Sequence, residues 1–170
     1  MQQVDVAVII VSYRSARLVV EALKSVCDER ARATSSIRVV VVDNASGDEG
    51  EIASAVAARS WGSWVELVAA PKNGGFAYGN NLGIRTACNF RVPDYIYLLN
   101  PDAQVRLGAI QTLVDFLETH PEAGIAGSSF ETVDGKDWPY AFRFPGLISE
   151  AISGIEVGLA TRMFKRWQVA

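Results

Sequence analysis

Two carboxylates follow apolar strand candidates, and they are the residues of this chain best suited to chemistry. Asp43 follows the four valines of residues 39–42, and Asp102 follows the apolar run 95–99 and Asn100-Pro101. In open α/β sheets a ligand lies in the crevice beyond the carboxyl ends of the strands. One acid could hold a base or ribose there. The other could hold a divalent metal, because Mg²⁺ and Mn²⁺ prefer oxygen ligands and often combine one or two carboxylates with substrate phosphates. The pair therefore predicts a nucleotide site.

Each acid also has a purely structural interpretation. Asp43-Asn44-Ala45-Ser46 could be a turn that caps the next helix, since Asp, Asn and Ser bond neighbouring backbone N–H groups. Asn100-Pro101-Asp102 could likewise be a plain turn, because Pro101 ends the strand. The sequence leaves both alternatives open.

A glycine-rich segment, residues 73–83, lies between the two acids. Its glycines could let the backbone approach a phosphate at a helix N-terminus. Gly75, Gly79 and Gly83 are also four residues apart, which favours a smooth helical face packed closely against the sheet. Packing alone does not explain why asparagines stand at positions 73, 80 and 81.

Strand and helix patterns alternate along the chain. Short continuous apolar runs, which favour buried strands, are followed by stretches with an apolar residue at every third or fourth position, which favour helices. Strands are predicted at residues 6–11, 37–42, 65–69, 95–99 and 123–127, and helices at about 18–26, 48–59, 76–89 and 107–119. Strands separated by helices imply parallel pairing with right-handed crossovers. We therefore predict an α/β fold with a mainly parallel, Rossmann-like open sheet and helices on both faces. Beyond residue 130 the alternation stops, and Asp134-Gly135 predicts a hairpin.

Composition limits the classes of function. A length of 170 residues with 49% hydrophobic content predicts one domain with a substantial core. The net charge of −3 gives no general attraction to nucleic acid, and no nucleic-acid partner is predicted. The longest apolar run, residues 6–11, is far shorter than the roughly 20 residues that span a bilayer. The first residues run straight into a strand without a leader pattern, so we expect a cytoplasmic location.

Four motifs, taken in order, resemble a known family. They are Val11-Ser12-Tyr13, the Val-Asp-Asn-Ala-Ser of residues 42–46, the Asn-rich glycine segments 73–77 and 80–83, and the Leu-Leu-Asn-Pro-Asp-Ala of residues 98–103. Together they are similar to the family-two glycosyltransferases of the GT-A fold, and most of all to their rhamnosyltransferase-like branch. The resemblance covers roughly residues 4–145. It implies a GT-A nucleotide-sugar-binding domain at 1–145 and the start of an incomplete acceptor region at 146–170.

The resemblance implies roles for residues at the nucleotide-sugar site. Ser12 and Tyr13 match the segment that lies against the base, and Asp43 matches the acid that contacts base or ribose. Three residues match the segment that lines the donor pocket: Asn73, Gly75 and Asn80.

The same resemblance implies a metal ligand. Asp102 matches the last acid of the family's Asp-x-Asp metal motif. Asn100 stands in place of the first acid, so one negative charge is lost, although an amide oxygen can still coordinate a metal or bond a ribose. The expected cofactor is a divalent metal, Mg²⁺ or Mn²⁺, that binds weakly without the nucleotide diphosphate.

The family implies transfer of a sugar from a nucleotide-diphosphate donor to an acceptor hydroxyl, with inversion at the anomeric carbon, in glycan or polysaccharide synthesis. The branch suggests dTDP-rhamnose as donor, with UDP-sugars next, and a glycan or lipid-linked acceptor. The family's general base is an Asp or Glu expected beyond Ala170, so no catalytic residue is identified here. We therefore expect a truncated acceptor half, with weak nucleotide binding and little or no transfer by this chain alone.

Two other functions stay open. A noncatalytic nucleotide-sugar-binding or partner module would also have a donor half without a base. A nicotinamide-dependent oxidoreductase would place a ribose-binding acid at Asp43, but residues 12–17 lack the glycines that let a pyrophosphate approach the backbone.

The tail, residues 146–170, carries apolar residues at every third or fourth position: Ile148, Ile152, Ile155, Leu159, Met163 and Trp167. This spacing predicts an amphipathic helix. With Arg162, Lys165 and Arg166 beside its aromatic residues, the helix could lie on an anionic membrane surface, which would make the protein peripheral at the inner face of the membrane. The alternative that we favour is that the helix packs on protein, either on the rest of the chain or by self-association with another copy.

Overall fold

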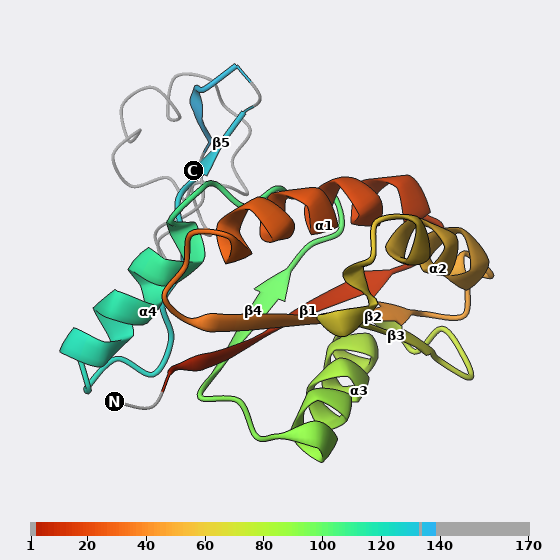
Figure 1. Ribbon diagram of the computed structural model, residues 1–170, viewed down its shortest axis with the longest axis horizontal. Coiled ribbons are helices and arrows are strands. Elements are labelled where there is room, and N and C mark those ends of the chain that lie inside the picture. The colour runs from red at the N-terminus through yellow and green to blue at the C-terminus, as the bar shows by residue number, and fades with distance from the viewer. Residues whose placement is uncertain (1–2, 133, 139–170) are drawn as a thin grey trace, which may run out of the picture. The chain divides into compact units, whose positions relative to one another are not determined.

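A parallel sheet forms the centre of the first of two compact units in the computed structural model, which describes residues 3–132 and 134–138. These units comprise residues 1–126 and 127–170. In the first unit the elements are β1 (Asp5–Ser12), α1 (Ala16–Arg30), β2 (Ser36–Asp43), α2 (Glu49–Ala58), the short 3-10 helix η1 (Trp61–Ser63), β3 (Val65–Ala69), α3 (Gly75–Phe90), β4 (Tyr95–Leu99) and α4 (Ala109–Thr119) (Figure 1). The predicted tail helix lies outside the described residues.

The four strands of this sheet run in the order β3-β2-β1-β4, and every pair is parallel. The chain first builds the sheet outwards from β1 through β2 to β3, and then returns to the other side of β1 to form β4. The strand order therefore reverses between β1 and β4. This is the mainly parallel α/β architecture that the alternating pattern predicts.

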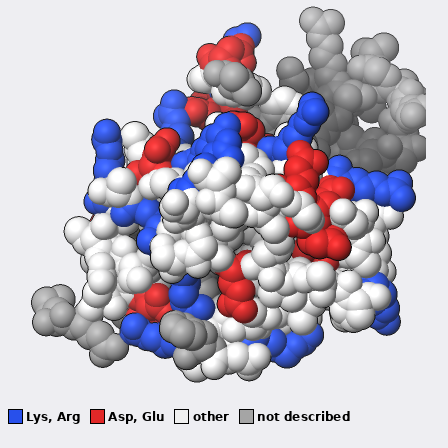
Figure 2. All heavy atoms as spheres, turned by 45° about the vertical axis from the view of Figure 1, so that its right-hand side comes forward, with Lys and Arg blue, Asp and Glu red and all other residues white. Residues whose placement is uncertain are grey.

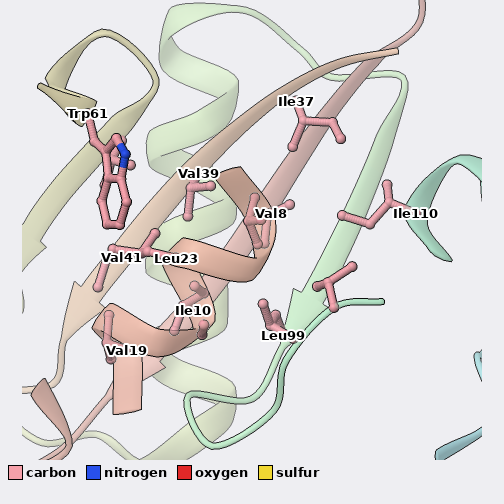
Figure 3. Close-up of a cluster of buried hydrophobic side chains, with 14 of the residues drawn as sticks. Val8, Ile10, Val19, Leu23, Ile37, Val39, Val41, Trp61, Leu99 and Ile110 are labelled. Carbon is pink, nitrogen blue, oxygen red and sulfur yellow. The ribbon is translucent and has the colours of Figure 1, made fainter. Parts of the chain in front are cut away.

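Helices cover both faces of the sheet, as predicted. On one face Val8 and Ile10 of β1 pack with residues of α1, α2 and α4, and Figure 3 shows this cluster around Leu23 and Ile110. On the other face Ala7 and Ile9 of β1 pack with residues of α3. Because successive side chains of a strand point to opposite faces, the unbroken apolar run 6–11 of β1 supplies both clusters. In Figure 1, α1 and α2 lie above the sheet and α3 below it.

Two glycines let α3 pack closely on the sheet. A Cβ atom on Gly79 would lie 2.6 Å from Val11 Cγ1, and one on Gly83 would lie 2.6 Å from Ile9 Cγ2. Gly75 differs, because nothing lies within 4 Å of its position and its φ of +82° is one that glycine adopts readily. The packing interpretation therefore holds for Gly79 and Gly83, whereas Gly75 serves the turn into the helix.

One predicted strand is wrong. Residues 123–127 form no strand, and Ile125 is 91% exposed. Two of the five residues are glycines, which weaken a strand because they lose much backbone entropy and offer no side chain to pack. The predicted hairpin at Asp134-Gly135 is confirmed: β5 (Phe130–Glu131) pairs antiparallel with β6 (Asp137–Trp138), and Gly135 has a φ of +78°.

Charged side chains of both signs are interspersed on the face shown in Figure 2, in keeping with a net charge of only −3. Among the described residues, no helix combines the length and the apolar character needed to cross a bilayer.

Candidate functional site

The carboxyl ends of the central strands bring the first predicted site residues together. Ser12, the last residue of β1, is the register partner of Asp43, the last residue of β2. On the other side of β1, Leu99 of β4 pairs with Ile10, so the segment that starts at Asn100 leaves the sheet at the same edge. This edge includes the point where the strand order reverses, which is where open α/β sheets bind ligands.

Asp43 is buried, and its carboxylate accepts three hydrogen bonds from its own loop. Oδ2 accepts from the backbone N–H groups of Ser46 and Gly47 at 3.1 and 3.2 Å, and Oδ1 accepts from the Ser46 hydroxyl. These hydrogen bonds confirm that residues 43–46 form a turn, but the turn does not cap the next helix, since α2 has Asp48 at its N-cap and no side-chain capping bond. Any contact of Asp43 with a nucleotide must use a remaining lone pair or exchange one of these bonds.

Asn44 ties the β2 loop to the glycine-rich segment, a role that sequence reasoning missed. Its Nδ2 donates to Asn73 Oδ1 at 2.9 Å and to the carbonyl oxygen of Gly75 at 3.2 Å. Its Oδ1 accepts the N–H of Gly74 at 3.3 Å, and its own N–H donates to the Ser12 carbonyl at 2.8 Å. Because Asn44 is buried, these bonds fix the entry to α3 against the ends of β1 and β2. A signal for it was present, since Asn44 belongs to the motif of residues 42–46 at the end of β2, which meets the other strand-end motifs at one edge of the sheet.

Asn73 and Gly75, both predicted to line the donor pocket, lie together. Asn73 Oδ1 also accepts the N–H of Gly75 at 3.0 Å, so the asparagine closes a tight turn at the start of α3. Asn80 lies one turn further along α3 and is buried, with its Nδ2 donating to the Phe76 carbonyl at 3.0 Å. Asn80 is therefore held against its own helix.

The loop after β1 presents one aromatic ring. Tyr13 is 45% exposed, and the Arg14 guanidinium lies 5.3 Å from the centre of its ring. Arg14 has a φ of +55°, which turns the chain sharply after β1. Ser12 is fully buried, with its hydroxyl 3.0 Å from that of Ser15. Tyr13 therefore offers a flat face at the carboxyl edge, whereas Ser12 supports the loop.

Asp102 and Asn100 lie in an exposed turn after β4. The N–H of Ala103 donates to the Asn100 carbonyl at 3.1 Å, which closes the turn. Within the described residues no hydrogen bond or ion pair engages the Asp102 carboxylate. The same part of the chain contains no group of three or more acid, His or Cys side chains that could hold a metal by themselves. One carboxylate and one amide oxygen fit a hard divalent ion whose remaining ligands are phosphates and water.

The family model for glycosyl transferase family 2 matches residues 7–154. The chain belongs to glycosyl transferase family 2. This confirms the family predicted from the four motifs, whereas the rhamnosyltransferase-like branch stays a prediction. No curated protein matches the chain significantly.

This family 2 chain is similar in fold to several solved structures. It is similar to TarS 1-349 from S. aureus with a TM-score of 0.59 and 18% identity, over 80% of this chain and 38% of that one. It is also similar to the mannosyltransferase PcManGT from Pyrobaculum calidifontis in complex with GDP-Man and Mn²⁺, with a TM-score of 0.54 and 25% identity, over 69% of this chain and 33% of that one. A structure of TarS 1-349 in complex with UDP matches with a TM-score of 0.55 and 18% identity, over 69% of this chain and 33% of that one. The family 2 chain thus spans between a third and two fifths of these structures.

Proposed function

We propose that this chain is the donor-binding part of an inverting glycosyltransferase, which moves a sugar from a nucleotide-diphosphate donor to an acceptor hydroxyl. The observation that carries the proposal is the arrangement at the carboxyl edge of the sheet. The bonded pair of loops after β2 and before α3 lies on one side of the end of β1, and the exposed acid after β4 lies on the other. Such an edge offers one place for a base and ribose and another for a metal-bound diphosphate.

On the nucleoside side, Tyr13 would stack on the base and Ser12 would support its loop. Asp43 would contact base or ribose through the one acceptor position that its loop leaves, since an ionised carboxylate has about four lone-pair sites and the loop donates to three of them. The complex of the similar TarS structure with UDP supports a nucleotide at this type of fold.

On the sugar side, Asn73 and Gly75 would line the donor pocket through the turn that Asn44 holds. Asn80 would line the same pocket from one turn further along α3. The exposed positions of Asn73 and Gly75 favour direct contact with the donor, and the buried position of Asn80 favours shaping of the pocket wall.

Asp102 and Asn100 would hold Mg²⁺ or Mn²⁺ together with the diphosphate. When bound, such a metal stabilises the negative charge that develops on the leaving diphosphate. Two observations support this assignment: no described group engages the Asp102 carboxylate, and the similar PcManGT structure contains Mn²⁺ and GDP-Man. The chain's single carboxylate in this turn favours metal binding that depends on the nucleotide.

Inverting transfer also requires a base that takes the acceptor's proton as its oxygen attacks the anomeric carbon and the bond from that carbon to the diphosphate oxygen breaks. Three described acids at this edge already have other roles: Asp43 holds its loop, Asp48 accepts the N–H of Ala16, and Asp102 is assigned to the metal. We therefore propose that the 170-residue chain binds donor nucleotide but transfers sugar slowly or not at all. Noncatalytic nucleotide-sugar binding is the second candidate, and the same observation favours it.

We also propose a donor, an acceptor and a cellular location. The motifs favour dTDP-rhamnose, with UDP-sugars next, and a glycan or lipid-linked acceptor in polysaccharide synthesis. We propose a cytoplasmic location, with or without peripheral attachment to the inner face of the membrane. A protein there would meet both the donor and the acceptor.

Calorimetric titration of dTDP, UDP and GDP into the purified chain, with and without Mn²⁺, tests the proposal. We expect one nucleotide to bind with metal dependence and the Asp102→Ala variant to lose at least about tenfold in affinity, which corresponds to about 1.4 kcal/mol. No binding of any nucleotide by the folded chain would contradict the proposal. Metal-dependent binding followed by fast transfer would contradict the part that denies this chain a base.

A further inference from the structure

The segment that carries Asp102 is attached to α1 by the side chain of Ser25, a residue of that helix. After the Asn100–Ala103 turn, the backbone N–H of Val105 donates to Ser25 Oγ at 2.9 Å. The Ser25 hydroxyl donates in turn to the Ala22 carbonyl within α1 at 2.7 Å, so both hydrogen-bonding roles of this hydroxyl are used. Ser25 is thereby fixed on its helix while it holds the segment.

A buried acid holds the end of the same segment. Glu29 is fully buried, and its carboxylate accepts the N–H groups of Gly108, Ile110 and Gln111, the last two at 3.1 and 3.2 Å. These donors are the N-cap residue of α4 and two residues of its first turn, where backbone N–H groups have no partner within the helix. A carboxylate is favoured there by the helix dipole as well as by the hydrogen bonds. Ser25 and Glu29 are four residues apart on α1, so both lie on one face of that helix.

We propose that Ser25 and Glu29 are positioning residues that hold Asp102 where the metal and diphosphate need it. The inference rests on the proposed function. Leu99 and Val105, which are 5% and 8% exposed, lie three residues before and after Asp102. A three-residue span reaches at most about 10 Å, so two fixed ends leave the exposed acid little room to move. Loss of the Val105 anchor would free one end.

Hydrophobic burial of Val105 would by itself keep the segment near α1, but it would not fix its register. A hydrogen bond to one backbone N–H does, because its geometry admits only a narrow range of distance and angle. Such order favours metal affinity at a site with a single protein carboxylate, because freedom of the acid that remains before binding must be lost when the metal binds.

Hydrogen exchange on the whole 170-residue chain tests the attachment without reference to nucleotide. The Ser25→Ala variant is expected to speed exchange of the Val105 amide about tenfold, because its hydrogen bond is lost. Ser25→Thr retains a hydroxyl and should restore slow exchange. Ser54→Ala is the matched control, because the Ser54 hydroxyl donates to the Gly50 carbonyl of α2 at 2.7 Å in the same manner but has no bond to the Asp102 segment. Equal exchange in Ser25→Ala and the control would overturn the attachment.

Nucleotide titration then tests the positioning role. The readout is the factor by which Mn²⁺ raises nucleotide affinity, and we expect Ser25→Ala to reduce this factor about fivefold, in keeping with loss of one ordinary hydrogen bond. Affinity without metal should stay within about twofold of the parent. Glu29→Gln should reduce the same factor, and Ser25→Thr should restore it.

The outcomes separate the two proposals. A parent chain that binds no nucleotide overturns the proposed function and the positioning role together, while the exchange result still decides whether the attachment exists. A parent chain that binds nucleotide with Mn²⁺, beside a Ser25→Ala variant with an unchanged Mn²⁺ factor, overturns the positioning role alone. Should Glu29→Gln fail to fold, Ser25→Ala and Ser25→Thr still give the decision.

Discussion

The loops after β2 and β4 start from the same local pattern, an acid beyond an apolar strand, and end in opposite arrangements. Asp43 is 1% exposed and accepts three hydrogen bonds from its own loop, whereas Asp102 is exposed and has no described partner. The segment around Asp102 is held instead through its backbone, by Ser25 and Glu29 on α1. One loop uses its acid for structure, and the other leaves its acid available for a ligand.

The position of each strand in the sheet explains the difference. β2 has β1 and β3 as neighbours, so the loop after it emerges between two other strand ends and its polar groups must find protein partners. Within the described residues β4 pairs only with β1, so its loop emerges at the side of the sheet and meets solvent. A similar pattern, an acid after an apolar strand, therefore has a different role according to strand order, which the pattern does not contain.

The largest expected effect comes from removing the structural acid. Asp43→Ala should lose about 2 kcal/mol of free energy of unfolding, because hydrogen bonds to a charged group contribute about 1.5–3 kcal/mol and water replaces them only in part. Asp102→Ala should change the same quantity by less than about 0.5 kcal/mol, as exposed substitutions usually do. Urea unfolding at neutral pH, followed by circular dichroism, measures both. Equal losses in the two variants would contradict the contrast between the loops.

Much of the fold was predictable because burial on both faces of a parallel sheet leaves a strong local signal. β1 contains the apolar run 6–11, β2 contains the four valines 39–42, and α1 shows an apolar stripe at helical spacing. The strand expected at 123–127 failed because three apolar residues separated by glycines gain too little by pairing. The helix expected from 107 begins at Ala109, since Gly108 has a φ of +84°, outside the helical range.

The site was harder to predict, since its decisive contacts join residues far apart in the chain. Asn44 and Asn73 are 29 residues apart, and Glu29 is 79 residues from Gly108. Glu29 did leave a signal: it continues the buried stripe of Val19, Leu23 and Val26 on α1, where a charged residue needs a partner. The stripe indicates that a partner exists, but only the sheet order indicates that the partner is α4.

A second prediction tests whether the β2 loop depends on Asn44 as well as on Asp43. Asn44→Asp keeps the shape of the side chain but replaces the Nδ2 donor with an oxygen that faces the acceptors Asn73 Oδ1 and Gly75 O. We expect a loss of about 1.5 kcal/mol of free energy of unfolding, because two donated bonds become repulsive contacts. Faster hydrogen exchange should be concentrated at residues 73–75, near the start of α3.

Asn81→Asp is the matched control for this substitution. It makes the same chemical change at an exposed position of α3, outside the hydrogen bonds of Asn44. The free energy of unfolding of the Asn81→Asp variant should lie within about 0.5 kcal/mol of that of the parent. A loss of equal size in both variants would mean that added negative charge, and not the Asn44 network, determines the result.

The smallest expected effect lies at the other end of β4, where Tyr95 donates its hydroxyl to Glu118 Oε1 at 2.6 Å. This hydrogen bond to a carboxylate, then burial and the charges of Glu118 and Asp94, raise the pKa of Tyr95 above its ordinary value of 10.0. Because the folded-state pKa is the higher one, the folded chain holds this proton more tightly than the unfolded chain does. The contribution to stability is therefore fully present below the pKa of the unfolded chain, and is lost as pH rises through the folded pKa.

Alkaline titration of tyrosine absorbance, compared between the parent and Tyr95→Phe, should show loss of a phase above the ordinary range, and Glu118→Gln should move that phase to lower pH. The exposed position of this pair predicts that stability at neutral pH changes little, since solvent screens such interactions. A Tyr95→Phe variant whose unfolding free energy falls as far as that of Asp43→Ala would show that β4 is fixed at its amino end by this bond. The freedom of the Asp102 loop would then be set at both ends of the strand, and not by α1 alone.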